Sequence, residues 1–176
     1  HIAAQNGNLE VIQCLLEKNP SLIHVDGNRR GWRPLDWASN VEVAKYLLEN
    51  GAILNPKPDV GPNTPKTIWS PLQAAAHSGN TAVAKYLIEK GAHLEGTGIN
   101  KRTALSFAAE QGNLEVVKLL IDKGAIVDAP DDANMSTVHY SIKGNHIDVI
   151  KYLIEKGADI NSICCQMDGG YSALDI

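Results

Sequence analysis

The chain has 176 residues, of which 44% are hydrophobic, so it is long enough to bury a core as one domain or one array. Its formal net charge of −4 argues against general polyanion binding, and we expect no nucleic-acid partner. No apolar segment approaches the ~18 residues that a membrane helix needs, so we expect no membrane contact either.

Gly-Ala pairs recur along the chain and begin at Gly51, Gly91, Gly124 and Gly157, with separations of 40, 33 and 33 residues. The segment KYLIEKGAHL at 85–94 returns as KYLIEKGADI at 151–160, which is two such periods later. A period of this length indicates an array of repeated supersecondary units that stack on their neighbours.

In chain order, the predicted array occupies 1–176 and divides into copies at 1–25, 30–55 (shortened), 67–95, 100–128, 133–161 and the start of a sixth at 169–176, with a Pro-rich insertion at 56–66. Each copy reads as a short inner helix followed by an amphipathic outer helix; in the fourth, Leu114, Val117 and Ile121 recur at helical spacing. Ser70 and Thr103 can cap inner helices.

Glycine marks where the outer helices end. Gly91, Gly124 and Gly157 stand where a left-handed residue is needed, and we expect Asn19 to take that place in the first copy. The second copy is shorter than the others: Leu35 and Gly51 are 16 positions apart, against 19 for Leu105 and Gly124. It lacks the Gly-containing turn, so its two helices are expected to join tightly.

The segments SPLQAAAHSGN (70–80), TALSFAAEQGN (103–113) and STVHYSIKGN (136–145), with RPLDWAS (33–39), resemble the ankyrin repeat. The resemblance covers nearly the whole chain and implies an all-α solenoid of stacked helix-turn-helix units joined by β-hairpin-like loops. It also implies a non-enzymatic protein-interaction module that meets its partners through the hairpin tips and inner helices.

The residue directly before each inner helix's capping residue occupies what we call the pre-helix position. It is Trp32, Trp69, Arg102, Met135 and Tyr171 in successive copies, and we expect it to be exposed. Trp and Arg are common in binding hot spots. The predicted partner-binding residues are Arg29, Arg30, Trp32, Arg33, Lys66, Trp69, His77, Lys101, Arg102, Met135 and Tyr171.

This set predicts a monomer that binds a protein or peptide of acidic character with apolar anchors. In the alternative interpretation, Trp32 and Trp69 pack over the Pro-rich loop. A second position lies inside each inner helix and holds Ile2, Trp37, Ala74, Phe107 and Tyr140. We call it the ring position and expect it to fill the core.

No catalytic, metal or cofactor constellation is present in the sequence, and we expect no enzyme and no cofactor. Cys164 and Cys165 lack a second pair at zinc spacing. Asp128, Asp131 and Asp132 lack the Gly and terminal Glu of a calcium loop.

The few cysteines favour a reducing compartment, cytoplasmic or nuclear, including that of a host cell if the source is a pathogen. Both ends of the chain cut into the repeat pattern. In an alternative interpretation, the array is a targeting or regulatory segment of a larger enzyme, channel or secreted effector. Asn161 also resembles ankyrin sites of asparaginyl hydroxylation, although a role in stabilising the hairpin is the simpler interpretation.

Overall fold

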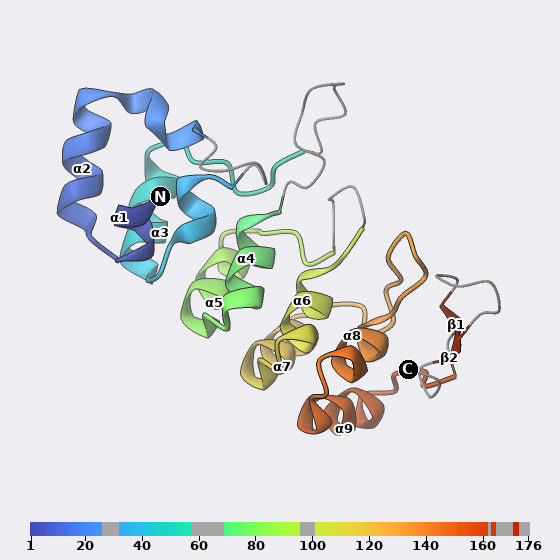
Figure 1. Ribbon diagram of the computed structural model, residues 1–176. Coiled ribbons are helices and arrows are strands. Elements are labelled where there is room, and N and C mark those ends of the chain that lie inside the picture. The colour runs from blue at the N-terminus through green and yellow to red at the C-terminus, as the bar shows by residue number, and fades with distance from the viewer. Residues whose placement is uncertain (26–31, 58–68, 96–100, 162, 165–170, 173–176) are drawn as a thin grey trace.

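The computed structural model describes residues 1–25, 32–57, 69–95, 101–161, 163–164 and 171–172. Helices follow one another in pairs that stack from one end of the chain to the other (Figure 1). The elements are α1 (Ile2–Gln5), α2 (Leu9–Lys18), η1 (Pro20–His24), η2 (Pro34–Trp37), α3 (Val41–Glu49), α4 (Pro71–Ser78), α5 (Thr81–Glu89), α6 (Ala104–Glu110), α7 (Leu114–Asp122), α8 (Thr137–Lys143) and α9 (Ile147–Glu155). This is the helical solenoid that the repeat period predicts.

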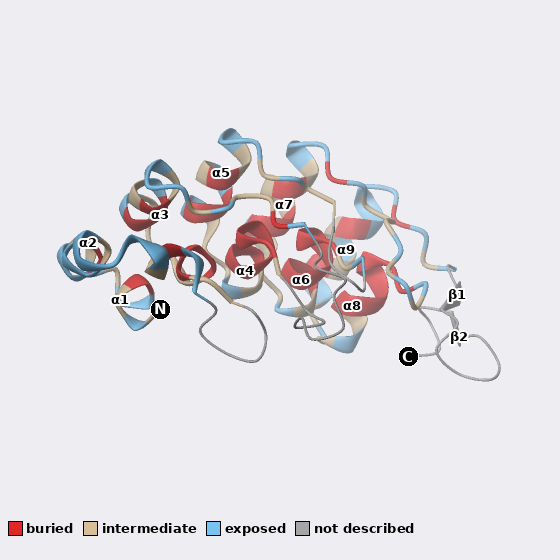
Figure 2. Cartoon of the chain, turned by 90° about the horizontal axis from the view of Figure 1, so that it is seen from above, coloured by how far each residue is buried: buried red, intermediate tan, exposed pale blue. Residues whose placement is uncertain are grey.

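The inner helices α4, α6 and α8 form one row, and the outer helices α3, α5, α7 and α9 form a second (Figure 2). The inner row is almost wholly buried: Leu72, Leu105 and Val138 have no exposed surface. The outer helices bury one face only, so Leu120 is buried whereas Glu115 is exposed. Because every helix pair packs against its neighbours, the hydrophobic core is continuous along the array.

The predicted caps are confirmed. The Ser70 hydroxyl accepts a hydrogen bond from the Gln73 N–H (3.2 Å), and that of Thr103 accepts one from the Ser106 N–H (3.1 Å). Gly91 has a φ of +90°, the left-handed conformation expected after an outer helix. The expectation for Asn19 is wrong, since its φ is −149°. Pro20 follows it, and a residue before proline is driven to extended backbone.

The second copy departs further from the pattern than its sequence suggests. In place of an inner α-helix it has the four-residue 3₁₀ turn η2, and Ala38 after it is extended. The Asn40 side chain then caps α3 through the Val43 N–H at 2.8 Å. With three residues fewer between Leu35 and Gly51, the chain has no room for a second inner turn, so a tight junction of two full helices is the wrong description.

Polar links join each copy to the one before it at the start of the outer helix. Asn80 Nδ2 donates to the Ser39 carbonyl at 2.7 Å, and Asn113 Nδ2 donates to the Ala76 carbonyl at 2.9 Å. His146 takes the same place in the fifth copy, with Nε2 3.0 Å from the Glu110 carbonyl. These links engage carbonyl groups at or just after the ends of inner elements; the Ala76 carbonyl also accepts the Gly79 N–H at 3.3 Å.

A second set of links joins the hairpin tips. Four residues after the glycine of the first three Gly-Ala pairs, a side-chain oxygen accepts a backbone N–H from the following copy. Asn55 accepts from His93 (2.9 Å), Glu95 from Ile126 (2.9 Å) and Asp128 from Asp159 (3.0 Å). Asn161 occupies the equivalent position in the fifth copy, which supports its interpretation as a hairpin residue.

Near the C-terminal end, β1 (Ile163–Cys164) pairs antiparallel with β2 (Tyr171–Ser172), which places Cys164 in a paired strand. Cys165 and all but the first two residues of the Pro-rich insertion lie outside the described residues. Among the residues that the structure describes, no helix is long and apolar enough to cross a membrane.

Candidate partner-binding surface

A row of flat side chains runs across the second to fifth copies. In order of contact it consists of Trp37, Trp32, Trp69, Phe107, Arg102 and Tyr140, and we call it the aromatic row. Ring centroids are 4.7 Å apart for Trp37 and Trp32, 4.9 Å for Trp32 and Trp69, and 4.2 Å for Trp69 and Phe107. The Arg102 guanidinium carbon then lies 3.9 Å from the Phe107 ring centre and 3.8 Å from that of Tyr140.

Residues of two different sequence positions alternate along this row. The pre-helix residue Arg102 lies between the ring-position residues of its own copy and the next, Phe107 and Tyr140. The alternation is interrupted where two pre-helix residues, Trp32 and Trp69, contact each other. Sequence reasoning assigned the pre-helix residues to the surface and the ring-position residues to the core, and the structure brings the two groups into one row.

The expected exposure of the pre-helix position is therefore wrong. Trp32, Trp69 and Arg102 are half-buried, and Met135 is buried, with 7% of its surface exposed. Rings of the following copy pack against Trp32, Trp69 and Arg102, and Met135 packs with Tyr140 of its own copy. The sequence alone does not show which residues of neighbouring copies come into contact. Trp32 and Trp69 pack against each other, and the loop over which they were alternatively expected to pack lies mostly outside the described residues.

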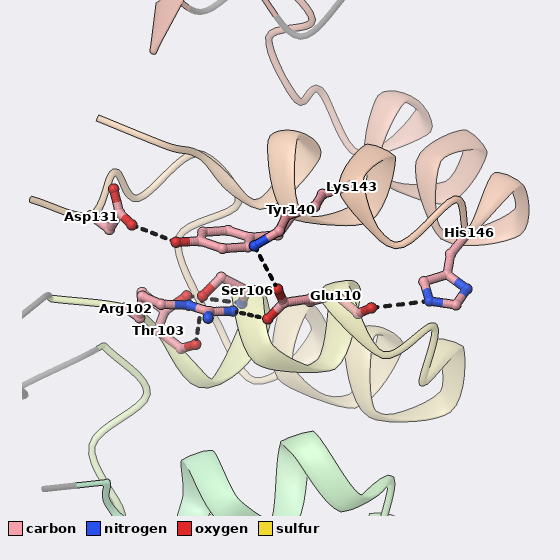
Figure 3. A network of polar contacts seen from close by, with 8 residues as sticks. All are labelled: Arg102, Thr103, Ser106, Glu110, Asp131, Tyr140, Lys143 and His146. Carbon is pink, nitrogen blue, oxygen red and sulfur yellow. Dashed lines mark hydrogen bonds and ion pairs between the residues drawn. The ribbon is translucent and has the colours of Figure 1, made fainter. Parts of the chain in front are cut away.

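At the C-terminal part of the row, Arg102 takes part in a polar network that joins the fourth and fifth copies (Figure 3). It forms an ion pair with Glu110 at 2.6 Å, and Lys143 approaches the other Glu110 oxygen at 3.3 Å. Partial burial opposes ionisation of Glu110, but the hydrogen bonds and charges of Arg102 and Lys143 outweigh it and hold its pKa below the ordinary value.

The Tyr140 hydroxyl belongs to the same network and donates to Asp131 Oδ2 at 2.5 Å (Figure 3). Burial, followed by this hydrogen bond to a carboxylate, raises the pKa of the Tyr140 hydroxyl. The other Asp131 oxygen accepts the Met135 N–H at 2.8 Å, which fixes the backbone before α8. The network thus orients residues of the fourth and fifth copies and leaves Arg102 engaged within the chain.

Two other basic residues of the predicted set have acidic neighbours. Arg33 Nε lies 3.9 Å from Asp36, and Lys101 Nζ lies 3.3 Å from Asp132. The structure therefore balances the positive charge of Arg33, Lys101 and Arg102 locally. Arg29, Arg30 and Lys66 lie outside the described residues, and only the backbone of Tyr171 is described.

His77 joins the N-terminal part of the row. Its ring centroid lies 5.1 Å from that of Trp69 in an edge-on arrangement, and it is half-buried near the end of α4. Trp32, Trp37, Trp69 and His77 thus form a half-exposed cluster from two copies. Of the predicted partner-binding residues, the structure brings Trp32, Trp69 and His77 together here, and they are joined by Trp37, which was expected to fill the core.

A pocket of about 380 Å³ opens beside this cluster, between η2 and α4. Its lining is Gln5, Trp32, Leu35, Asp36, Trp37, Ala38, Ser39, Pro71, Ala74, Ala75, His77, Ser78, Asn80 and Val83. Sequence reasoning did not predict this pocket. Two features of the sequence could have indicated it: the shortened second copy, and Ala74 at the ring position, where the second, fourth and fifth copies carry an aromatic residue.

The acidic residues of the hairpins accept hydrogen bonds from backbone N–H groups. Asp128 and Asp131 accept backbone N–H groups of other residues, as described above. Within the described parts of the chain, no three His, Cys, Asp or Glu side chains are grouped to hold a metal ion.

Comparison with known families matches the chain to a model described as ankyrin repeats (3 copies), over residues 1–58, 53–130 and 72–164. No curated protein sequence matches it. Ankyrin repeats are general protein-interaction modules. The matched segments together span most of the 176 residues, and the stacked helix pairs agree with them. The chain belongs to the ankyrin-repeat family.

Proposed function

We propose that this array is a non-enzymatic interaction module whose partner, a protein or peptide, docks on the cluster of Trp32, Trp37, Trp69 and His77. The observation that supports it is the contact of three half-buried tryptophans from two copies at one surface. Large aromatic side chains in such a setting offer much apolar area at a small cost in conformational entropy.

The charge of the partner is a separate part of the proposal. An acidic partner was expected from the basic pre-helix neighbourhood, but Arg33, Lys101 and Arg102 are already close to acids of this chain. Attraction of an acidic partner then depends on Arg29, Arg30 and Lys66. Apolar contact of the partner with the tryptophans is better supported than attraction of an acidic partner, and we propose it as the main source of affinity.

The test is affinity capture of proteins from an extract with the intact chain, followed by affinity measurement for the captured protein. The double variant Trp32→Ala, Trp69→Ala should bind it at least about 30-fold more weakly, since each hot-spot truncation typically costs about 2 kcal/mol. Circular dichroism must show that the variant retains its helix content. Equal affinity in a folded double variant would contradict the proposal.

A matched control is Tyr86→Ala on α5. Tyr86 is also a half-buried aromatic residue, but it lies on an outer helix away from the cluster. It should leave affinity unchanged. For location, we propose an intracellular compartment on the basis of the sparse cysteines; a fluorescent fusion found outside the cell would contradict this.

A further inference from the structure

We propose that the pocket between η2 and α4 is a binding site for a single aromatic side chain of the protein or peptide partner. The inference rests on the proposed function and refines it, because it assigns one chemical group of the partner to one place on this chain. Two independent features of the fold create the pocket, and its lining defines what fits.

The first feature is an interruption in the aromatic row. Ala74 occupies the ring position of the third copy, where the second, fourth and fifth copies carry Trp37, Phe107 and Tyr140. By the alternation seen around Arg102, a ring at Ala74 would stand between Trp32 and Trp69. In its absence the two tryptophans approach each other directly, at 4.9 Å, and unfilled space remains beside Ala74.

The second feature is the length of η2. It has four residues, whereas α4 behind it has eight, so the end of α4 extends past the element of the preceding copy. Ala75 and Ser78, from the second half of α4, consequently line the pocket. The shortening of the second copy leaves open a surface that a full inner helix would cover.

The lining favours an aromatic ring over other side chains. Leu35, Ala74 and Val83 form the apolar floor of the pocket, with 2%, 5% and 2% of their surface exposed, and the half-buried indoles of Trp32 and Trp37 supply flat surfaces for offset or edge-on ring contact. The volume of about 380 Å³ is at the small end of ligand pockets, which span ~300–1,000 Å³, and suits one side chain.

The pocket is less suited to binding a cationic side chain. Asp36 is the carboxylate in the lining, and it already accepts the Arg33 backbone N–H at 2.7 Å with the Arg33 guanidinium close by. Polar groups at Ser39, Ser78 and Asn80 also line the pocket, where an indole N–H or a phenol hydroxyl of the entering residue can find a partner. The lining therefore favours Trp, Tyr or Phe as the partner residue that enters the pocket.

The probe is N-acetyl-L-tryptophanamide, titrated into the ¹⁵N-labelled chain while the indole N–H signals are followed by NMR. The chain contains three tryptophans, and all belong to the cluster, so each indole signal reports on this surface. We expect saturable shifts of the Trp32 and Trp37 signals. N-acetyl-L-leucinamide and N-acetyl-L-argininamide should require at least about tenfold higher concentrations for the same shift, since they lack an aromatic ring.

Two variants close the pocket in different ways. Ala74→Phe supplies the missing ring from within the chain, so it should abolish the saturable shifts. Ser78→Phe changes an exposed lining residue and should abolish the shifts with little effect on folding, which keeps the test valid if Ala74→Phe does not fold. Lys85→Phe on the exposed face of α5 is the control and should respond as the unmodified chain does.

Absence of saturable shifts in the unmodified chain would overturn the inference, and so would an unchanged response in a folded Ala74→Phe or Ser78→Phe variant. Equal responses to the tryptophan and leucine probes would overturn the assignment to an aromatic ring. The proposed function fails separately, through equal partner affinity of the Trp32→Ala, Trp69→Ala double variant. A failure of one therefore does not imply a failure of the other.

Discussion

The guanidinium group of Arg102 stacks on the ring of Tyr140, a residue of the following copy, with its carbon 3.8 Å from the ring centre. The same group contacts Phe107 of its own copy and forms an ion pair with Glu110. One side chain thus connects two adjacent copies through both its flat faces and its edge, because the planar guanidinium can stack and donate at the same time.

Replacing Arg102 should weaken the connection between the fourth and fifth copies. We expect Arg102→Ala to lower the free energy of unfolding by about 2–3 kcal/mol, because it removes two ring contacts and leaves Glu110 without its closest cation. Arg102→Lys should recover less than half, since an ammonium group cannot stack. Urea denaturation measures both. Lys118→Ala, which removes the exposed pair with Glu115, is the control and should leave the free energy of unfolding nearly unchanged.

The Glu110 carboxylate should make stability depend on pH in the acid range. Its pKa in the folded chain lies below the ordinary 4.5, so the unfolded chain takes up the proton first as the pH falls. The stabilisation is complete above pH 4.5 and is lost as the pH drops through the folded-state pKa. Glu110→Gln should therefore be destabilised at pH 7 by about 1–2 kcal/mol, and the difference should shrink at pH 3.

Thermal unfolding of both proteins at pH 7, 5, 4 and 3 provides the measurement. A constant difference between Glu110→Gln and the unmodified chain across this range would show that the charge of Glu110 does not matter. Arg102→Ala offers an internal check, because the pH dependence assigned to Glu110 should be smaller once its nearest cation is gone.

Substitution of Asn113 tests the hydrogen bonds that link neighbouring copies at the start of the outer helices. Its amide donates to the carbonyl groups of Ala76 and His77, at 2.9 and 3.0 Å. Asn113→Asp keeps the size of the side chain but removes the donors, so unfolding should become easier by about 1–3 kcal/mol at pH 7. Asn8→Asp is the matched control, because Asn8 caps α2 by accepting from Val11, a role that Asp fills equally well. Equal effects of the two substitutions would argue against the cross-copy link.

Gly144 and Gly157 should respond to alanine for different reasons. Gly144 lies outside the left-handed region, but a Cβ there would collide with the Glu110 carbonyl oxygen and the His146 ring, at an expected cost of about 2–3 kcal/mol. Gly157 has a φ of +90° with open space around it, so only backbone strain of about 1 kcal/mol is expected. Chemical denaturation of the two variants gives the comparison, and a larger cost at Gly157 would contradict it.

The sequence predicts the repeated parts of this structure well. The helix pairs, the Ser70 and Thr103 caps and the glycine after each outer helix all depend on residues within a few positions of one another, and the repeat period places them correctly. Asn19 is an exception with a local cause, since the following Pro20 forces extended backbone there.

The candidate surface was only partly predictable, because it is formed by residues of different copies. Both members of each contact in the aromatic row are visible in the sequence, but the order in which Trp32, Trp69 and Phe107 meet depends on how the copies stack. The same is true of charge: Arg102 reads as an available cation, whereas Glu110 and Tyr140 engage it in the folded chain.

The four-residue turn η2 has a consequence for how such a surface can arise or disappear. A pocket that comes from a shorter backbone is encoded by the length of the chain as well as by residue identity. In an otherwise similar array, a full-length second copy would cover the second half of α4 at this place, even if the array kept Trp32, Trp37 and Trp69. Specificity here can be gained or lost by a deletion or insertion of three residues, without any substitution in the aromatic row.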